Sequence, residues 1–274
     1  MSDPRTTVRH APAEHKFEGT SMTIAPLRPG TPAPPVQTLP PGSWHGRLWV
    51  SDLPLTRPER YLGCVAEFER SGLWPVLIPH DQRFAANGED WIDDRGRLAP
   101  AGHRVPTADP AGALSRWWDG SCCDGACLRP FGARFPGLAK RSPRRSDPLA
   151  EAGNTGSILA NRAPHRLGLV QTERPADIPA LLGWTGMIKC TDQVAELSAV
   201  LRSWEDRFGA TLVVLGFDAI ELSVAAPPRN QARALTVAAE HRAFCLPTFA
   251  GQPGNLREYA SGLVQSRHWR FSWA

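Results

Sequence analysis

The stretch that most constrains the fold lies between residues 191 and 224, where an amphipathic helix leads directly into two short apolar strands. A tight turn at Asp218 separates the strands, and the second strand alternates apolar with polar side chains. Such a strand buries one face and leaves the other in water, which is typical of an antiparallel hairpin. Within the helix, apolar residues alternate steps of three and four along one face. These residues are Val194, Leu197, Leu201, Trp204 and Phe208.

The segments around this stretch extend the pattern in both directions. A strand is predicted at residues 165–171, and two further helices are predicted at residues 227–245 and 255–264. The last strand places its tryptophans and phenylalanine on one face through a Trp-x-Phe-x-Trp pattern at residues 269–273. The order β-α-β-β-α-α-β predicts an α+β fold, a mainly antiparallel sheet with helices packed on one face.

Upstream of this region, the chain divides into three parts. Nine prolines and little apolar periodicity predict a disordered, Pro-rich tail over residues 1–42. Residues 43–145 form an N-terminal α/β region that begins with a smaller β-α-β unit, and residues 146–164 are interpreted as a linker. The C-terminal α+β domain then covers residues 165–274.

Composition excludes several classes of protein. With 42% hydrophobic residues in 274, the chain can bury a core without disulfides or metal, and no apolar run is long enough to span a bilayer. The start lacks the apolar stretch of a secretion signal, so we expect a cytoplasmic protein with reduced cysteines. Residues 128–146 hold six Arg or Lys and no acid, but their prolines and glycines favour a solvated connector over a nucleic-acid surface.

The C-terminal half carries a family resemblance. The run "LSAVLRSWEDRFGATLVVLGFDAIELSVAAPP", the later "AAEHRAFC" and the aromatic terminal strand resemble DUF4253, a bacterial family of domains of unknown function. The resemblance covers about residues 165–274 and implies no particular reaction. Relatives tend to follow the cysteine with Pro-Asp and to end in Phe-Trp-Trp-Asp, whereas here Cys245 precedes Leu-Pro-Thr and the chain ends in Trp273 and Ala274. This departure argues against catalysis at Cys245.

His241 and Cys245 are the candidate catalytic pair, because they lie four residues apart at the end of a predicted helix. With His268 they could form the site of a hydrolase or transferase. However, a reactive thiolate is favoured at a helix N-terminus, and this cysteine lies at a C-terminus. The preferred interpretation is therefore a buried thiol beside a histidine that, when protonated, interacts favourably with the helix end.

Two further sets of residues are candidates for binding. His268 and Arg270 project from the polar face of the last strand, and Trp184 is an aromatic ligand candidate, although ordinary packing explains all three. Thiolates at Cys122, Cys123 and Cys127 could bind zinc with Cys64 or His103, or the segment is a loop of ordinary thiols. No phosphate-binding loop, nucleophile elbow or dinucleotide fingerprint occurs, so we expect no cofactor.

The sequence thus predicts a binding or interaction module without catalysis. Its partner would be a protein or a small molecule, bound through an exposed face of the C-terminal sheet, with no membrane and no nucleic acid involved. The alternative is a Cys/His-dependent enzyme that uses Cys245 and His241.

Overall fold

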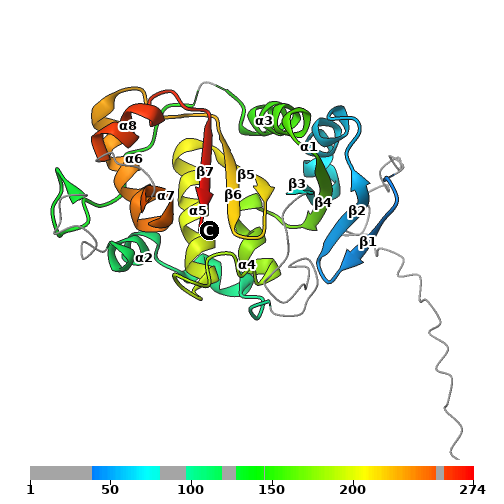
Figure 1. Cartoon of the computed structure of the whole chain (residues 1–274), viewed down its shortest axis with the longest axis horizontal. Helices are drawn as coiled ribbons and strands as arrows, with labels where there is room; N and C mark the ends of the chain where they lie inside the picture. The colour runs from blue at the N-terminus through cyan, green and yellow to red at the C-terminus, as the bar shows by residue number, and fades with distance from the viewer. Residues whose placement is uncertain (1–38, 81–96, 119–127, 145, 251–255) are drawn as a thin grey trace, which may run out of the picture. The chain divides into compact units, whose positions relative to one another are not determined.

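The computed structural model describes residues 39–80, 97–118, 128–144, 146–250 and 256–274. Most of the expected disordered tail lies outside these residues, and Gly42 already begins the first strand. The helices and strands of the described residues are shown in Figure 1.

The described strands form one sheet of seven, in the order β1-β2-β4-β3-β5-β6-β7. Every neighbouring pair is antiparallel except β3 and β5, which are parallel. The fold is therefore α+β with a mostly antiparallel sheet, as the sequence predicts. The strands are β1 (Gly42–His45), β2 (Leu48–Pro54), β3 (Leu73–Pro79), β4 (His165–Gln171), β5 (Ala210–Leu215), β6 (Ala219–Val224) and β7 (His268–Ser272).

Helices of very different lengths connect these strands. No helix in the described part of the chain is both long and apolar enough to cross a membrane. The α-helices are α1 (Glu59–Ser71), α2 (Pro110–Trp117), α3 (Pro148–Arg162), α4 (Ile178–Leu182), α5 (Val194–Phe208), α6 (Gln231–Phe244), α7 (Pro247–Ala250) and α8 (Leu256–Leu263). Two 3₁₀ helices are η1 (Gly102–Thr107) and η3 (Pro175–Asp177).

The N-terminal β-α-β unit is present as β2, α1 and β3, but its strands are not neighbours. β4 lies between β2 and β3 and pairs with both in antiparallel fashion. On its other side β3 pairs with β5, and the indole of Trp74 donates a hydrogen bond of 2.8 Å to the carbonyl of Leu212. The N-terminal region and the C-terminal region thus contribute strands to the same sheet.

The linker interpretation of residues 146–164 is wrong, because helix α3 occupies most of that segment. Asp147 caps the helix by accepting a hydrogen bond from the Ala150 N–H at 2.8 Å. The glycines that suggested a loop instead allow α3 to pack closely on α1. A Cβ at Gly153 would lie 2.4 Å from Cδ1 of Leu62, and one at Gly156 would lie 2.0 Å from Cε1 of Tyr61.

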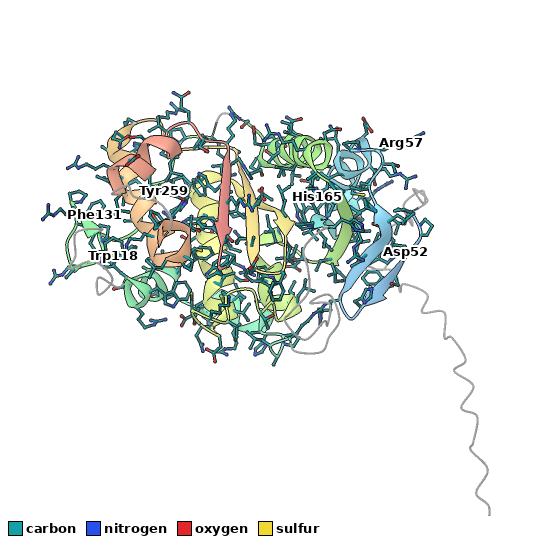
Figure 2. The ribbon with its side chains drawn as sticks, viewed as in Figure 1. Asp52, Arg57, Trp118, Phe131, His165 and Tyr259 are labelled. Carbon is teal, nitrogen blue, oxygen red and sulfur yellow. The ribbon has the colours of Figure 1, made fainter. Side chains whose placement is uncertain are left out.

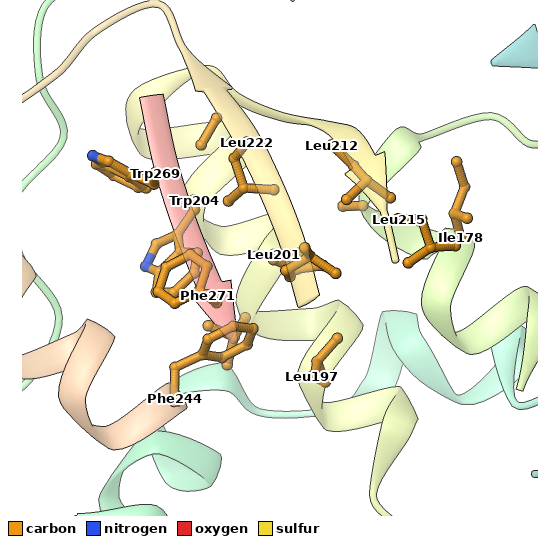
Figure 3. Close-up of a cluster of buried hydrophobic side chains, with 14 of the residues drawn as sticks. Ile178, Leu197, Leu201, Trp204, Leu212, Leu215, Leu222, Phe244, Trp269 and Phe271 are labelled. Atoms are coloured by element: carbon orange, nitrogen blue, oxygen red, sulfur yellow. The ribbon is translucent and has the colours of Figure 1, made fainter. Parts of the chain in front are cut away.

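The C-terminal region follows the predicted order, with α4 and α7 as short additions. α5 ends at Gly209, whose φ of 57° is the left-handed conformation typical of a helix C-terminus. The β5–β6 hairpin is antiparallel, and β7 pairs with β6. Figure 3 shows Trp269 and Phe271 of β7 beside Trp204 of α5 and Phe244 of α6, so the aromatic terminal strand is part of the core.

Candidate functional site

His241 lies fully buried in an aromatic cage. Its ring centroid is 4.5 Å from that of Trp269, 4.8 Å from Phe271 and 5.0 Å from Trp204. Nδ1 is hydrogen-bonded to the Tyr259 hydroxyl at 3.1 Å. Burial, and then the nearby positive charge of Arg207, lowers the pKa of His241 to about 3. The imidazole is therefore neutral near pH 7, and the expected protonated helix cap is wrong.

Cys245 is buried beside the last strand. Its Sγ donates to the carbonyl of Ser272 at 3.2 Å and accepts from the hydroxyl of Thr248 at 3.1 Å. Burial raises the pKa of the thiol to about 11, although these hydrogen bonds lower it in part. The backbone N–H of Cys245 donates a hydrogen bond of 2.9 Å to the backbone carbonyl of His241. No hydrogen bond joins the two side chains among the described residues.

The most extensively bonded polar group in this core is one that the sequence analysis did not single out. The carboxylate of Glu240 is buried and accepts from the indole of Trp204 at 2.7 Å. It also accepts from both terminal nitrogens of Arg207, at 2.8 and 2.6 Å, and from the Ala139 N–H at 2.6 Å. We call Glu240, Arg207 and Trp204 the interior cluster. The run Glu-His-Arg between alanines in the second half of α6 was the available signal.

This cluster also corrects the expectation for the basic segment. Residues 128–144 contain no α-helix or strand, but they are not a fully solvated connector. Ala139 and Ser142 are buried, and the Ser142 N–H donates to the carbonyl of Arg207 at 3.0 Å. The segment therefore packs against the C-terminal region through its backbone.

On the opposite face of β7, His268 and Arg270 meet Glu221 of β6. Nε2 of His268 lies 2.7 Å from Oε2 of Glu221, and Nε of Arg270 lies 3.7 Å from Oε1. Burial raises the pKa of Glu221, but the His268 hydrogen bond and the charges of His268 and Arg270 outweigh it, so the pKa lies below its usual value. We call Glu221, His268 and Arg270 the edge cluster, since β7 is the last strand of the sheet.

The remaining sequence candidates lie elsewhere. Trp184 is buried in the core, where its indole donates to the carbonyl of Gly216 at 2.9 Å. Among the described residues no group of three or more His, Cys, Asp or Glu could hold a metal ion. The zinc candidates Cys122, Cys123 and Cys127 lie outside the described residues.

A cleft of about 300 Å³ runs between α8 and β7 and brings several polar and aromatic groups together. We call it the α8–β7 cleft. Figure 2 shows Tyr259, which lies on α8. This residue lines the cleft, and its hydroxyl is hydrogen-bonded to the buried His241. The lining side chains include Glu258 and Tyr259 of α8 and His268, Trp269 and Arg270 of β7, and the α8 wall also includes Gly262.

Two features make this cleft suited to a ligand. Trp269 is buried, yet its indole N–H has no hydrogen-bond partner among the described residues. In Figure 3 this nitrogen lies at the outer end of the ring, away from β7. On the opposite wall, a Cβ added to Gly262 would meet no described atom within 4 Å. The residue that carries the unpartnered donor and an exposed glycine with open space beside it therefore line the same hollow.

A larger hollow of about 620 Å³ lies beside the start of α1. It is lined by Leu39 at the beginning of the described chain and by Arg57, Arg60 and the half-buried Cys64. Burial raises the pKa of Cys64 to about 11. No aromatic side chain lines this hollow, and of the sequence candidates only Cys64, a candidate zinc ligand, does so; the α8–β7 cleft is therefore the better candidate site.

Comparison with known proteins agrees with the family resemblance. Residues 166–274 match the model of a family described as Domain of unknown function (DUF4253). Neither a curated protein nor a solved structure matches the chain. The matched residues begin in β4 and include both clusters and the α8–β7 cleft. The C-terminal part of this chain, residues 166–274, is therefore similar to the DUF4253 family.

Proposed function

We propose that this chain is a cytoplasmic binding module without catalysis, and that the α8–β7 cleft is its ligand site. The observation that carries the proposal is that Trp269, whose buried indole N–H has no hydrogen-bond partner among the described residues, lines the same hollow as His268 and Arg270. A buried donor without a partner is costly, and a ligand with an acceptor group would remove that cost. Concave sites with aromatic walls and a few convergent polar groups are the usual form of a ligand site.

The state of the Cys245 thiol favours binding over catalysis. A nucleophilic cysteine acts as the thiolate and needs a base within hydrogen-bond reach. The pKa of this thiol is raised to about 11, and its sulfur is bonded to Thr248 and Ser272 rather than to His241. The enzyme alternative therefore lacks an activated nucleophile at the residues on which it was based.

The charges of the cleft favour a protein or a small molecule over a nucleic acid or a membrane. Its walls combine Glu258 with His268 and Arg270, a mixed set rather than a run of cations. A surface that follows a phosphate backbone needs clustered Lys and Arg, and a membrane-binding surface needs them beside a broad apolar face.

The experiment is a titration of the ¹⁵N-labelled full chain with a set of small carboxylic acids, amides and aromatic heterocycles. Bound fragments are expected to shift the Trp269 indole signal and the Arg270 amide signal. The variant Gly262→Phe fills the open space and should abolish those shifts. Gly262→Ala is the matched control, since it alters the same helical position but leaves most of the space open.

Two results would contradict the proposal. One is that no fragment moves either signal. The other is that the fragments that move them bind equally well to wild type and to Gly262→Phe, which would place the ligand elsewhere.

A further inference from the structure

β7 is the outer strand of the sheet and pairs with β6 alone among the described strands. Its backbone groups alternate in direction along the strand. The Trp273 N–H donates to the carbonyl of Asp218, and the carbonyl of Arg267 accepts from the Val224 N–H, each at 2.8 Å. The odd-numbered residues of this segment therefore direct their N–H and C=O groups toward β6, and the even-numbered residues direct theirs outward.

At both ends of β7, side chains of this protein form hydrogen bonds with backbone groups that point away from β6. The Ser272 N–H donates to the hydroxyl of Thr248 at 3.3 Å, and the Ser272 carbonyl accepts from Sγ of Cys245 at 3.2 Å. At the other end, the carbonyl of His268 accepts from the hydroxyl of Ser266 at 2.8 Å. These contacts protect the ends of the edge against strand pairing.

Arg270 lies between these two protected ends. Its N–H and C=O point outward by the same alternation, and no side chain among the described residues binds either of them. Arg270 also lines the α8–β7 cleft, so the open backbone pair belongs to a residue of the proposed ligand site. In an antiparallel sheet, a hydrogen-bonded pair of residues exchanges both its N–H···O bonds. Arg270 is the even-numbered residue of β7 whose N–H and C=O both lack a side-chain partner among the described residues, so it can form such a pair with one residue of an added antiparallel strand.

The side chains around this residue indicate what the added strand carries. A residue directly opposite Arg270 has its side chain on the same face as the guanidinium, which is 64% exposed. An acidic side chain at that position would complement this charge. The residues before and after it would point to the other face, toward Trp269 and the α8 residues Tyr259 and Leu263. Apolar side chains suit those two positions.

We propose that the α8–β7 cleft binds an extended peptide segment of a partner protein with the pattern apolar–acidic–apolar, which adds to β7 by antiparallel pairing at Arg270. This inference rests on the proposed function and names the ligand class of the same site. Main-chain hydrogen bonds supply part of the affinity of such added strands, and pockets for alternate side chains supply specificity.

The test uses the full chain and a set of pentapeptides, acetyl-Ser-Xaa-Glu-Xaa-Ser-amide, in which Xaa is Val, Ile, Leu, Phe or Tyr. The tightest binder is expected to shift the backbone amide of Arg270. N-methylation of its central Glu removes the donor to the Arg270 carbonyl and should weaken binding about tenfold or more. N-methylation of the following residue is the matched control and should change affinity by less than about twofold, since its N–H points away from β7.

A charge exchange tests the acidic preference separately. The variant Arg270→Glu keeps the backbone pair and reverses the charge, so it should prefer the peptide with a central Lys over the peptide with a central Glu. Wild type should show the opposite preference. If Arg270→Glu still prefers the peptide with a central Glu, the acidic residue proposed opposite Arg270 is wrong.

The outcomes separate this inference from the proposed function. If small fragments bind the cleft but no peptide does, or if the N-methyl-Glu peptide binds as tightly as its parent, strand addition is wrong and the cleft remains a ligand site. If neither fragments nor peptides respond to Gly262→Phe, both proposals fail.

Discussion

Glu240 and Glu221 lie in the same domain, and each is paired with an arginine, but their surroundings differ sharply. Glu240 in the interior cluster is fully buried, and each of its oxygens is engaged by Trp204, Arg207 or a backbone N–H. Glu221 in the edge cluster shares its charge with His268 and with an arginine that is mostly exposed. The interior cluster thus holds α5 and α6 together, whereas the side chains of His268 and Arg270 in the edge cluster remain partly exposed.

The two histidines show the same contrast. His241 is enclosed by aromatic rings and has lost its basicity to burial. His268 keeps a carboxylate partner and lines the cleft. From the sequence both are catalytic candidates, His241 for its spacing from Cys245 and His268 as a third member, and their burial in the structure separates them.

Cysteine alkylation should show the largest difference between interior and edge. Cys245 is buried with a raised thiol pKa, whereas Cys190 is exposed and serves as an internal control. If Cys245 reacts only through unfolding, iodoacetamide should modify it more slowly than Cys190 by a factor above about 10³. Peptide mapping by mass spectrometry at pH 8 measures both rates. Comparable rates in the folded protein would show that the interior opens locally.

Removal of the Glu240 charge is the next largest expected effect. Glu240→Gln leaves the guanidinium of Arg207, whose side chain is only 13% exposed, without its counter-charge, and the free energy of unfolding should fall by about 3–5 kcal/mol. Chemical denaturation followed by tryptophan fluorescence measures the change. The double variant Glu240→Leu with Arg207→Leu removes both charges and should recover most of the loss. Equal destabilisation of both variants would point to a packing defect rather than an uncompensated charge.

His241 should make stability depend on pH. In the unfolded chain its pKa is near 6.5, and in the folded protein it is about 3, so the unfolded state binds the proton over the interval between them. The stability of wild type should therefore fall by about 1.4 kcal/mol for each pH unit below 6.5, relative to His241→Phe. Unfolding curves of both proteins from pH 7.5 to 4.5 give this difference. Parallel pH profiles would mean that the imidazole is solvated.

The smallest expected effect belongs to the edge cluster. Glu221→Gln removes a half-exposed ion pair and should lower stability by only about 0.5–1 kcal/mol at pH 6.5. Because the pKa of Glu221 is lowered in the fold, this contribution is present above about pH 4.5 and disappears as the pH falls and the carboxyl is protonated. Thermal unfolding at pH 6.5 and pH 3.5 tests both points. A loss as large as that of Glu240→Gln would remove the contrast between the two clusters.

Local patterns in the sequence predicted the C-terminal fold well. The helical spacing of Val194 to Phe208 and the alternation around Phe271 each report which face of an element is buried, and the structure confirms both. The candidate site was predicted only in part, since His268 and Arg270 were identified but the wall formed by Tyr259 and Gly262 was not. That wall depends on how α8 packs beside β7, which no local pattern encodes.

The errors came from residues whose partners are distant in sequence. Gly153 and Gly156 resemble loop residues until the side chains of Leu62 and Tyr61 are placed against them. Glu240 resembles a solvated charge until Arg207 from another helix reaches it. The type of these residues correctly predicts a small or a charged group, but whether that group is buried depends on contacts with distant parts of the chain.

The parallel pair of β3 and β5 has a practical consequence for how the chain can be divided. A fragment cut at residue 166 would keep the residues that match the family model but would remove β2 and β3, leaving β4 without either neighbour and the β5 edge bare. It would also remove the indole of Trp74 that binds the carbonyl of Leu212. Expression of residues 166–274 alone should therefore give a product that aggregates. A fragment that begins near residue 39 keeps all seven described strands and should fold on its own.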